Sequence, residues 1–208
     1  MFVRFGPCDT VIEFFPPDSR PYGLTYGQWT VKWWQWLASI SADKSPAADE
    51  SGKFAGINQP HAPVWFLAGT LGGKSVNRKC AIPGGCSVLF PVINYEMNAL
   101  EKPDLKSDQD LIKHVVEDQD DILNLECMID SQIPQIHRVR SDPVIFTINF
   151  HTNNPFNISS ATTTRATSDG YWVFIKRLEP GEHNLYFAGS CSSGIRNVRA
   201  RYGLRVLE

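Results

Sequence analysis

Asn94 and Glu96 are the residues of this 208-residue chain whose types and spacing are best suited to chemistry. They lie two positions apart at the end of a strand expected over residues 87–95, so both side chains point to the same face. A carboxyl group in such a place can act as a general acid or base, and an amide beside it can orient a substrate. A structural alternative also fits, with Asn94 capping a turn and Glu96 paired with an arginine.

A long loop and the strand after it supply the residues that we expect to complete this pocket. The loop covers residues 41–63 and is rich in Ser, Ala, Asp, Gly and Pro. Loops of this length are often functional, and side chains at its end precede a buried strand expected over residues 64–69. The candidate site consists of Gln59, His61, Trp65 and Asn94 as ligand-binding residues, with Glu96 as the candidate catalytic residue.

Residues 68–75, which read AGTLGGKS, match the loose form of a phosphate-binding loop. In such a loop the Lys-Ser pair opens a helix whose free N–H groups hold the phosphates. Here the residues that follow, 76–82, are strand-like and end at Pro83. We therefore interpret the segment as a glycine turn with an exposed Lys74.

The five cysteines and five histidines show no metal-binding spacing. Cys80 and Cys86 flank a Pro-Gly-Gly turn that can bring two strand ends within bridging distance, so they are the candidate disulfide in an oxidising compartment. Otherwise they are two small buried or free thiols. We predict no metal and no cofactor.

Composition restricts the partners of the chain. A formal charge of −2 argues against a general nucleic-acid binder, because phosphate attraction needs a basic surface. No segment approaches the ~20 apolar residues of a membrane span, and no apolar export signal is evident near the N-terminus. We expect a soluble protein whose compartment the sequence leaves open.

The elements that must position the site begin with a tryptophan-rich segment. Four of the six tryptophans fall in residues 29–36, at a spacing that gives a helix one broad apolar stripe. Thr25 with Gln28 fits a capping box, so we predict a helix over residues 25–40. Core packing is the favoured role of these indoles over stacking on a sugar. Trp34 lies off the stripe and is the one most expected to face a ligand or partner.

A second helix is predicted over residues 107–131, where apolar residues recur at helical spacing after a capping box of Ser107 and Asp110. The remaining apolar segments are short, separated by turn signals, and read as strands. We therefore predict a mainly β fold, a jelly-roll-like antiparallel β-sandwich with two helices. The Pro-rich residues 1–24 form an extended arm, and residues 25–208 a single domain.

Several segments resemble a family of small uncharacterised microbial proteins, and the resemblance covers most of the chain from Pro21 onward. The matching segments are YGLTYGQW at 22–29, WWQW at 33–36, VWFLAG at 64–69, LFPVIN at 89–94 with Glu96, DGYWV at 169–173 and PG at 180–181. The resemblance implies no activity, substrate or cofactor. Members of that family often carry an export signal, which this chain does not show.

These observations favour a non-catalytic module that binds a small or carbohydrate-like ligand, or a partner chain, near the strand ends at Asn94. Two hypotheses of other classes stay open. One is a hydrolase or lyase that uses Glu96 as a general acid or base. The other is a structural subunit that associates with copies of itself through its tryptophan helix and strand edges.

Overall fold

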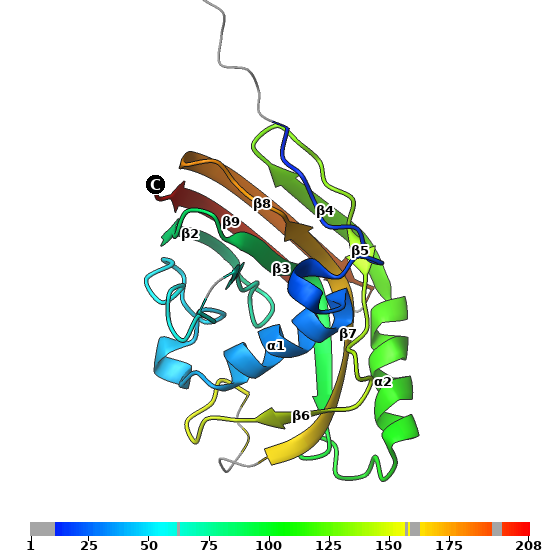
Figure 1. Cartoon of the computed structure of the whole chain (residues 1–208). Helices are drawn as coiled ribbons and strands as arrows, with labels where there is room; N and C mark the ends of the chain where they lie inside the picture. Colours follow the sequence, from blue (N-terminus) through cyan, green and yellow to red (C-terminus); the bar gives the residue numbers. More distant parts are fainter. Residues whose placement is uncertain (1–10, 62, 157, 159–162, 193–196) are drawn as a thin grey trace, which may run out of the picture.

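Two β-sheets packed face to face form the body of the protein (Figure 1). The computed structural model describes residues 11–61, 63–156, 158, 163–192 and 197–208. Sheet A has the strand order β1-β3-β7-β5, with β6 also paired to β7, and sheet B has the order β2-β9-β8-β4. The predicted mainly β sandwich with two helices is thus confirmed.

The strands of sheet A are β1 Val64–Phe66, β3 Ser87–Asn98, β5 His137–Arg138, β6 Phe146–Asn149 and β7 Thr163–Ile175. Those of sheet B are β2 Ser75–Ile82, β4 Ile122–Ile129, β8 Gly181–Cys191 and β9 Asn197–Val206. The helices are α1 Tyr26–Ala38 and α2 Asp108–Asp120, with short 3-10 turns at Pro21–Gly23 and Ala42–Lys44. Pairing is antiparallel except at two sheet edges, where β1 runs parallel to β3 and β2 runs parallel to β9.

One hydrophobic core lies between the two sheets. It is built from alternating inward side chains of both, among them Phe90, Val173, Phe187 and Leu204. Alternation is clearest on β9, where Ala200, Tyr202, Leu204 and Val206 are buried and the intervening arginines are exposed. This pattern is the period of two that one buried sheet face requires.

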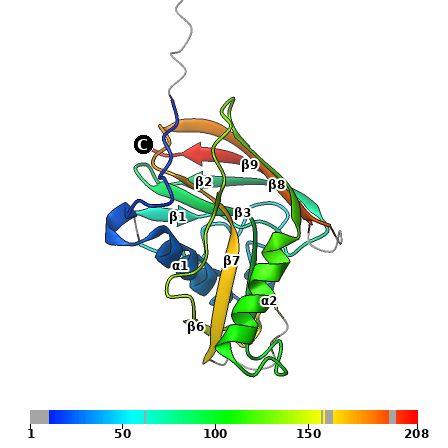
Figure 2. The ribbon, with the colours of Figure 1, turned by 90° about the vertical axis from the view of Figure 1, so that its right-hand side faces the viewer.

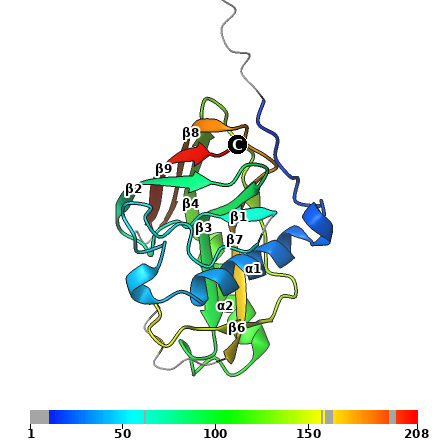
Figure 3. The same cartoon turned by 60° about the vertical axis from the view of Figure 1, so that its left-hand side comes forward.

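A second core lies on the outer face of sheet A, which α1 covers (Figure 3). The helix begins as predicted, because Thr25 Oγ1 accepts from Gln28 N at 3.1 Å and Gln28 Oε1 accepts from Thr25 N at 2.9 Å. Three indole N–H groups donate to carbonyl oxygens: Trp29 to Pro21 (2.9 Å), Trp33 to Leu67 (2.9 Å) and Trp36 to Ile57 (2.8 Å). The tryptophans therefore act mainly as core residues that also anchor the surrounding loops.

The second helix is shorter than the sequence indicates. The capping box of Ser107 and Asp110 is present, and α2 packs through Leu111 and Val115 against Met97 of β3 (Figure 2). The prediction of one helix over residues 107–131 is nevertheless wrong beyond residue 121, because residues 122–129 form β4 and pair with β8. Apolar side chains on both faces of β4 imitate helical spacing, and only the pairing with β8 distinguishes strand from helix.

The described part of the predicted arm, residues 11–24, is only partly extended, because residues 17–18 form a turn and Pro21–Gly23 form a 3-10 turn. Phe15 N donates to Phe174 O at 2.9 Å, and Phe14 forms a bridge with Ile175, so the arm lies beside β7. Residues 1–10 of the predicted arm lie outside the described residues. No helix in the described part of the chain has the length and apolarity needed to cross a membrane.

Candidate functional site

A cavity of about 250 Å³, here named the Glu96 cavity, lies between α1, β3 and the loop that joins β1 to β2. Apolar and aromatic side chains form much of its wall, including Trp33, Trp34, Leu37 and Phe156. Its polar lining residues are Thr70, Asn94, Tyr95, Glu96 and Glu101. Among the described residues that line it, none is a lysine, arginine or histidine.

Four polar atoms of this lining are buried without a hydrogen-bond partner. They are Trp34 Nε1, Thr70 Oγ1, Asn94 Nδ2 and Glu96 Oε1, out of ten such side-chain atoms in the described part of the chain. Buried polar groups in folded proteins are almost always paired, and each one that is not costs roughly 1–3 kcal/mol. Four buried polar atoms without partners around one cavity are therefore unusual for a folded protein, and they distinguish this cavity as a candidate site.

The carboxyl group of Glu96 is the least compensated of these groups. Glu96 is 5% exposed, and the one hydrogen bond that its side chain makes within the described residues is a long contact of 3.4 Å from Asn98 Nδ2 to Oε2. Burial raises the pKa of Glu96 well above its usual value, the nearby charge of Glu101 raises it further, and the Asn98 contact only partly opposes them. The environment therefore favours the protonated, neutral acid.

Asn98 connects Glu96 to a second carboxyl group. The same Nδ2 donates to Glu101 Oε2 at 2.6 Å, while Asn98 Oδ1 accepts from Leu100 N at 3.0 Å and from Glu101 N at 3.1 Å. These backbone contacts fix the amide so that its donor points at both acids. Glu101 lies at the exposed rim, and partial burial of its carboxyl group raises the pKa of Glu101 as well.

A β-bulge in β3 directs Asn94 and Glu96 into the cavity. Before the bulge, Leu89 packs on the α1 face; simple alternation would then place residues 93 and 95 there. The register shifts between Pro91 and Ile93, and Ile93 instead packs against Gly189 of sheet B. The shift moves Asn94 and Glu96 to the α1 side, which is how bulges redirect side chains near sites.

Gly170 of β7 makes room for this arrangement. It lies opposite Asn94, and a Cβ at position 170 would come within 2.5 Å of Asn94 Cβ and 2.9 Å of Asn94 Cα. Real side chains do not approach backbone atoms so closely, so a larger residue would push β3 and β7 apart. The glycine of the DGYW segment thus has a direct steric role beside the cavity.

Arg78 of β2 holds the loop wall of the cavity in place, although nothing in the sequence motifs drew attention to it. Its side chain is 1% exposed and is surrounded by neutral oxygen acceptors. They are the carbonyl oxygens of Asp49 (2.6 Å), Ala68 (2.7 Å), Gly69 (2.8 Å) and Ala47 (3.3 Å) and the hydroxyl of Tyr202 (2.7 Å). The signal that could have found it is alternation, since Val76, Arg78 and Ile82 share one buried face.

The structure of the same loop shows that residues 68–75 do not form a phosphate-binding loop. Ser75 opens strand β2, where a nucleotide-binding loop needs a helix to begin. Lys74 is exposed and pairs with Glu50 at 3.1 Å. The segment is therefore a glycine-containing connection whose residues 69–72 form part of the cavity wall.

Gln59, His61 and Trp65 do not join Asn94 and Glu96. Gln59 fastens its own loop to β1, because it donates to Phe66 O and accepts from Phe66 N, both at 2.8 Å. His61 is exposed, and the ring of Trp65 would meet a Cβ at Gly56 at 3.6 Å. The reason is topological: β1 pairs in parallel with the start of β3, so Trp65 lies beside Val88 rather than beside the far end of β3.

Cys80 and Cys86 carry free thiols in the structure, although the sequence made them the candidate disulfide. Burial raises the pKa of the Cys80 thiol to about 12 and also raises the pKa of Cys86. A thiol is a poor nucleophile when its thiolate is disfavoured. Within the described residues, no three His, Cys, Asp or Glu side chains cluster as metal ligands would.

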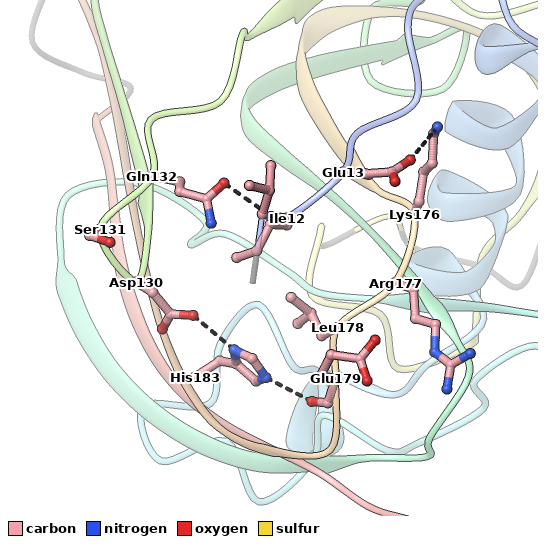
Figure 4. Close-up of a pocket in the computed structure, with 11 residues that line it drawn as sticks. Ile12, Glu13, Asp130, Ser131, Gln132, Lys176, Arg177, Leu178, Glu179 and His183 are labelled. Carbon is pink, nitrogen blue, oxygen red and sulfur yellow. Dashed lines mark hydrogen bonds and ion pairs between the residues drawn. The ribbon is translucent and has the colours of Figure 1, made fainter. Parts of the chain in front are cut away.

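A second cavity, of about 460 Å³, lies where the N-terminal arm meets the sandwich (Figure 4), and we name it the arm cavity. Several of its polar side chains are paired with one another or with the backbone. The pairs are Glu13 with Lys176 (2.8 Å), His183 with Asp130 (2.8 Å) and with Glu179 O (2.8 Å), and Gln132 with Ile12 N (3.0 Å). The contacts of Glu13 and Ile12 fasten the arm to Lys176, just after β7, and to Gln132, just after β4. The contacts of His183 hold β8 to Asp130 and Glu179.

No protein-family model, no curated protein and no solved structure matches this chain. Its function must therefore be inferred from the chemistry of its own residues. The Glu96 cavity is the stronger candidate site, because it holds four of the ten buried polar atoms that lack a partner in the described part of the chain, whereas the arm cavity holds none of the ten.

Proposed function

We propose that this protein is a non-catalytic module that binds a small organic molecule in the Glu96 cavity. One observation carries the proposal: α1, the β1–β2 loop and β3 each contribute at least one unpartnered buried polar atom to the same aromatic-walled cavity. In a purely structural core, the unpartnered polar atoms of these three segments would lower the stability of the fold with no compensating gain. A ligand that forms hydrogen bonds with these atoms removes that penalty.

The chemical character of the lining indicates how such a ligand is held. The indole N–H of Trp34 and the amide of Asn94 are donors, the hydroxyl of Thr70 can donate or accept, and Glu96 can donate when protonated. Aromatic walls supply most of the contact area, and a few polar groups set orientation, as in typical small-molecule sites. With about 250 Å³, the cavity admits a compact molecule of roughly ten non-hydrogen atoms, since a cavity of about 150 Å³ already holds benzene.

Binding can be tested by a thermal-shift screen of fragment-sized compounds on the full chain. We expect compounds that raise the melting temperature, and we expect Trp34→Phe to weaken their binding about three- to tenfold through loss of one hydrogen bond. Trp65→Phe is the matched control, because Trp65 also has an unpartnered buried indole nitrogen but does not line the cavity. The absence of any stabilising compound, or equal losses in both variants, would contradict the proposal.

A second candidate function is acid–base catalysis by Glu96. The raised pKa of this carboxyl group favours it, since a neutral buried acid can donate a proton to a leaving group. The test is turnover of chromogenic glycosides and esters, where Glu96→Gln should reduce any activity by about 100-fold or more. Activity that survives Glu96→Gln would exclude this role. Self-association, the third hypothesis from the sequence, stays a prediction.

A further inference from the structure

The charge balance of the Glu96 cavity is one-sided. Glu96 and Glu101 share a single amide donor, that of Asn98, and the described residues that line the cavity bring no cation to either. A carboxyl group in such surroundings must keep its proton or acquire a positive partner. Anionic ligands such as phosphates or carboxylates are disfavoured here, because they would add to the charge of Glu101.

The aromatic wall suits a positively charged group. The rings of Trp33 and Trp34 meet at 90° with centroids 5.0 Å apart, and Phe156 is tilted at 51° to Trp34 with centroids 6.3 Å apart. All three residues line the cavity. Rings in several planes around a small space are the arrangement in which aromatic faces attract ammonium groups, most strongly where water is excluded.

The unpartnered donors require one more feature of the ligand. Trp34 Nε1 and Asn94 Nδ2 can only donate hydrogen bonds, and an ammonium group offers them no acceptor. A ligand that satisfies the whole lining therefore carries an oxygen atom close to its positive charge. The volume of about 250 Å³ restricts it to a compact molecule.

We infer that the Glu96 cavity binds a small organic ammonium compound bearing a neighbouring hydroxyl or carbonyl oxygen, with the positive charge beside Glu96 and the oxygen facing Trp34 and Asn94. This inference rests on the proposed binding function and specifies its ligand class. Because the free protein favours neutral Glu96, binding of the cation releases a proton, and affinity rises with pH. Glu101 and Tyr95 are the other titratable described residues of the lining, while α1 and the β1–β2 loop contribute none.

Choline and ethanolamine are suitable probes, each with an uncharged counterpart of nearly the same shape. The counterparts are 3,3-dimethylbutan-1-ol for choline and propan-1-ol for ethanolamine. Calorimetric titration of the full chain should show the charged member of at least one pair binding about tenfold or more tightly than its counterpart. Glu96→Gln should remove most of this difference, whereas Glu13→Gln in the arm cavity should leave it unchanged.

Proton release on binding is a second readout of the inferred ligand class. It distinguishes a specific loss of the Glu96 carboxyl group from a variant that simply fails to fold. Titrations of the charged probe in buffers of different ionisation enthalpy should reveal proton release, with affinity rising as the pH increases toward the raised pKa of Glu96. Glu96→Gln should abolish the release.

The outcomes separate the ligand class from the binding function. If the uncharged compounds bind as tightly as the charged ones, or if only neutral or anionic fragments from the screen bind, the ammonium inference is wrong and the binding function stands. If neither the probes nor any fragment binds, both are wrong.

Discussion

Asp169 and Glu96 are two buried carboxyl groups on the paired strands β7 and β3, and they differ in the hydrogen-bond and ionic partners that surround them. Asp169 is held by Arg138 through Nε at 3.0 Å and a terminal nitrogen at 2.9 Å, and its other oxygen accepts from Gly170 N at 2.8 Å. Glu96 has, among the described residues, only a long contact of 3.4 Å from the side-chain amide of Asn98. A buried carboxylate that is paired with an arginine holds elements of the fold together. A buried carboxyl group that lacks a cationic partner is available to bind a ligand.

The difference follows from what covers each carboxyl group. Arg138 comes from β5 and also pairs with Asp120 of α2 at 2.6 Å, so it joins β7, β5 and the end of α2. On the Glu96 side, α1 and the β1–β2 loop contribute aromatic, apolar and uncharged polar side chains to the cavity. Two carboxyl groups on paired strands of one sheet thus have different roles because of the elements packed against them.

The largest expected effect comes from removing the partner of Asp169. Arg138→Met leaves a carboxyl group of 2% exposure with only Arg140, at 3.9 Å, as a cation. We expect the free energy of unfolding to fall by about 3 kcal/mol, the lower part of the range for a broken buried pair, since Arg138 is itself partly exposed. Urea unfolding measures it.

Two variants check this assignment. Arg165→Met removes an exposed partner of Asp108 and should cost less than about 1 kcal/mol. Adding Asp169→Asn to Arg138→Met should restore part of the stability, because the uncompensated charge is gone. If Arg138→Met lowers the free energy of unfolding no more than Arg165→Met does, the pair of Arg138 with Asp169 does not hold the fold together, and the contrast with Glu96 disappears.

Gly170→Ala tests the steric link between the two strands. The new Cβ would lie 2.5 Å from Asn94 Cβ, so we expect a loss of about 1–3 kcal/mol from overpacking, together with weaker ligand binding. Gly203→Ala on β9 is the control, because its nearest contact would be Lys79 Cγ at 3.5 Å. Equal stability of the two variants would show that β3 and β7 separate easily at Asn94.

Glu96→Gln should change how stability depends on pH. The pKa of Glu96 is higher in the folded than in the unfolded chain, where it is near 4.5, so its contribution is complete below that value. Stability should then fall as pH rises toward the folded pKa, by at most about 1.4 kcal/mol per pH unit. Glu96→Gln removes this decline. Carboxyl groups with lowered pKa, such as Asp49 and Asp110, contribute the opposite slope, so the test is the difference between the wild-type and Glu96→Gln curves. A difference that rises with pH would show that Glu96 is ionised and compensated in the folded chain.

Glu101→Gln is expected to have the smallest effect. The charge of Glu101 contributes to the raised pKa of Glu96, so its removal should lower that pKa and end the decline in stability at a lower pH. Because Glu101 lies at the exposed rim, we expect a stability change of only ~0.5 kcal/mol. Lys102→Gln in the same turn is the control. No shift of the pH curve would mean that solvent screens the two carboxyl groups from each other.

Local sequence patterns predicted those features that depend on local physics. Capping boxes at Thr25 and Ser107 mark both helix starts correctly, since such caps need only residues three positions apart. The two-residue spacing of Asn94 and Glu96 correctly predicts a shared face. Trp34, which lies off the apolar stripe of α1, lines the same cavity, while its contact with a ligand or partner stays a prediction.

Features that depend on distant partners were missed. Residues 122–129 look helical until β8 pairs with them, and Trp65 seems close to Asn94 until the parallel pairing of β1 with β3 separates them. Arg78 carries no motif, and its role depends on carbonyl oxygens supplied by the loop over residues 41–63 and by the end of β1.

By itself, the sequence determined that this chain folds as a β-sandwich with a tryptophan-rich helix, because periodicity and caps act over a few residues. Only the tertiary structure decided which carboxyl group is paired with an arginine and which is buried beside aromatic rings. That outcome depends on which face each side chain takes after the β3 bulge and on what the opposing elements bring there, namely arginines beside Asp169 and aromatic rings beside Glu96.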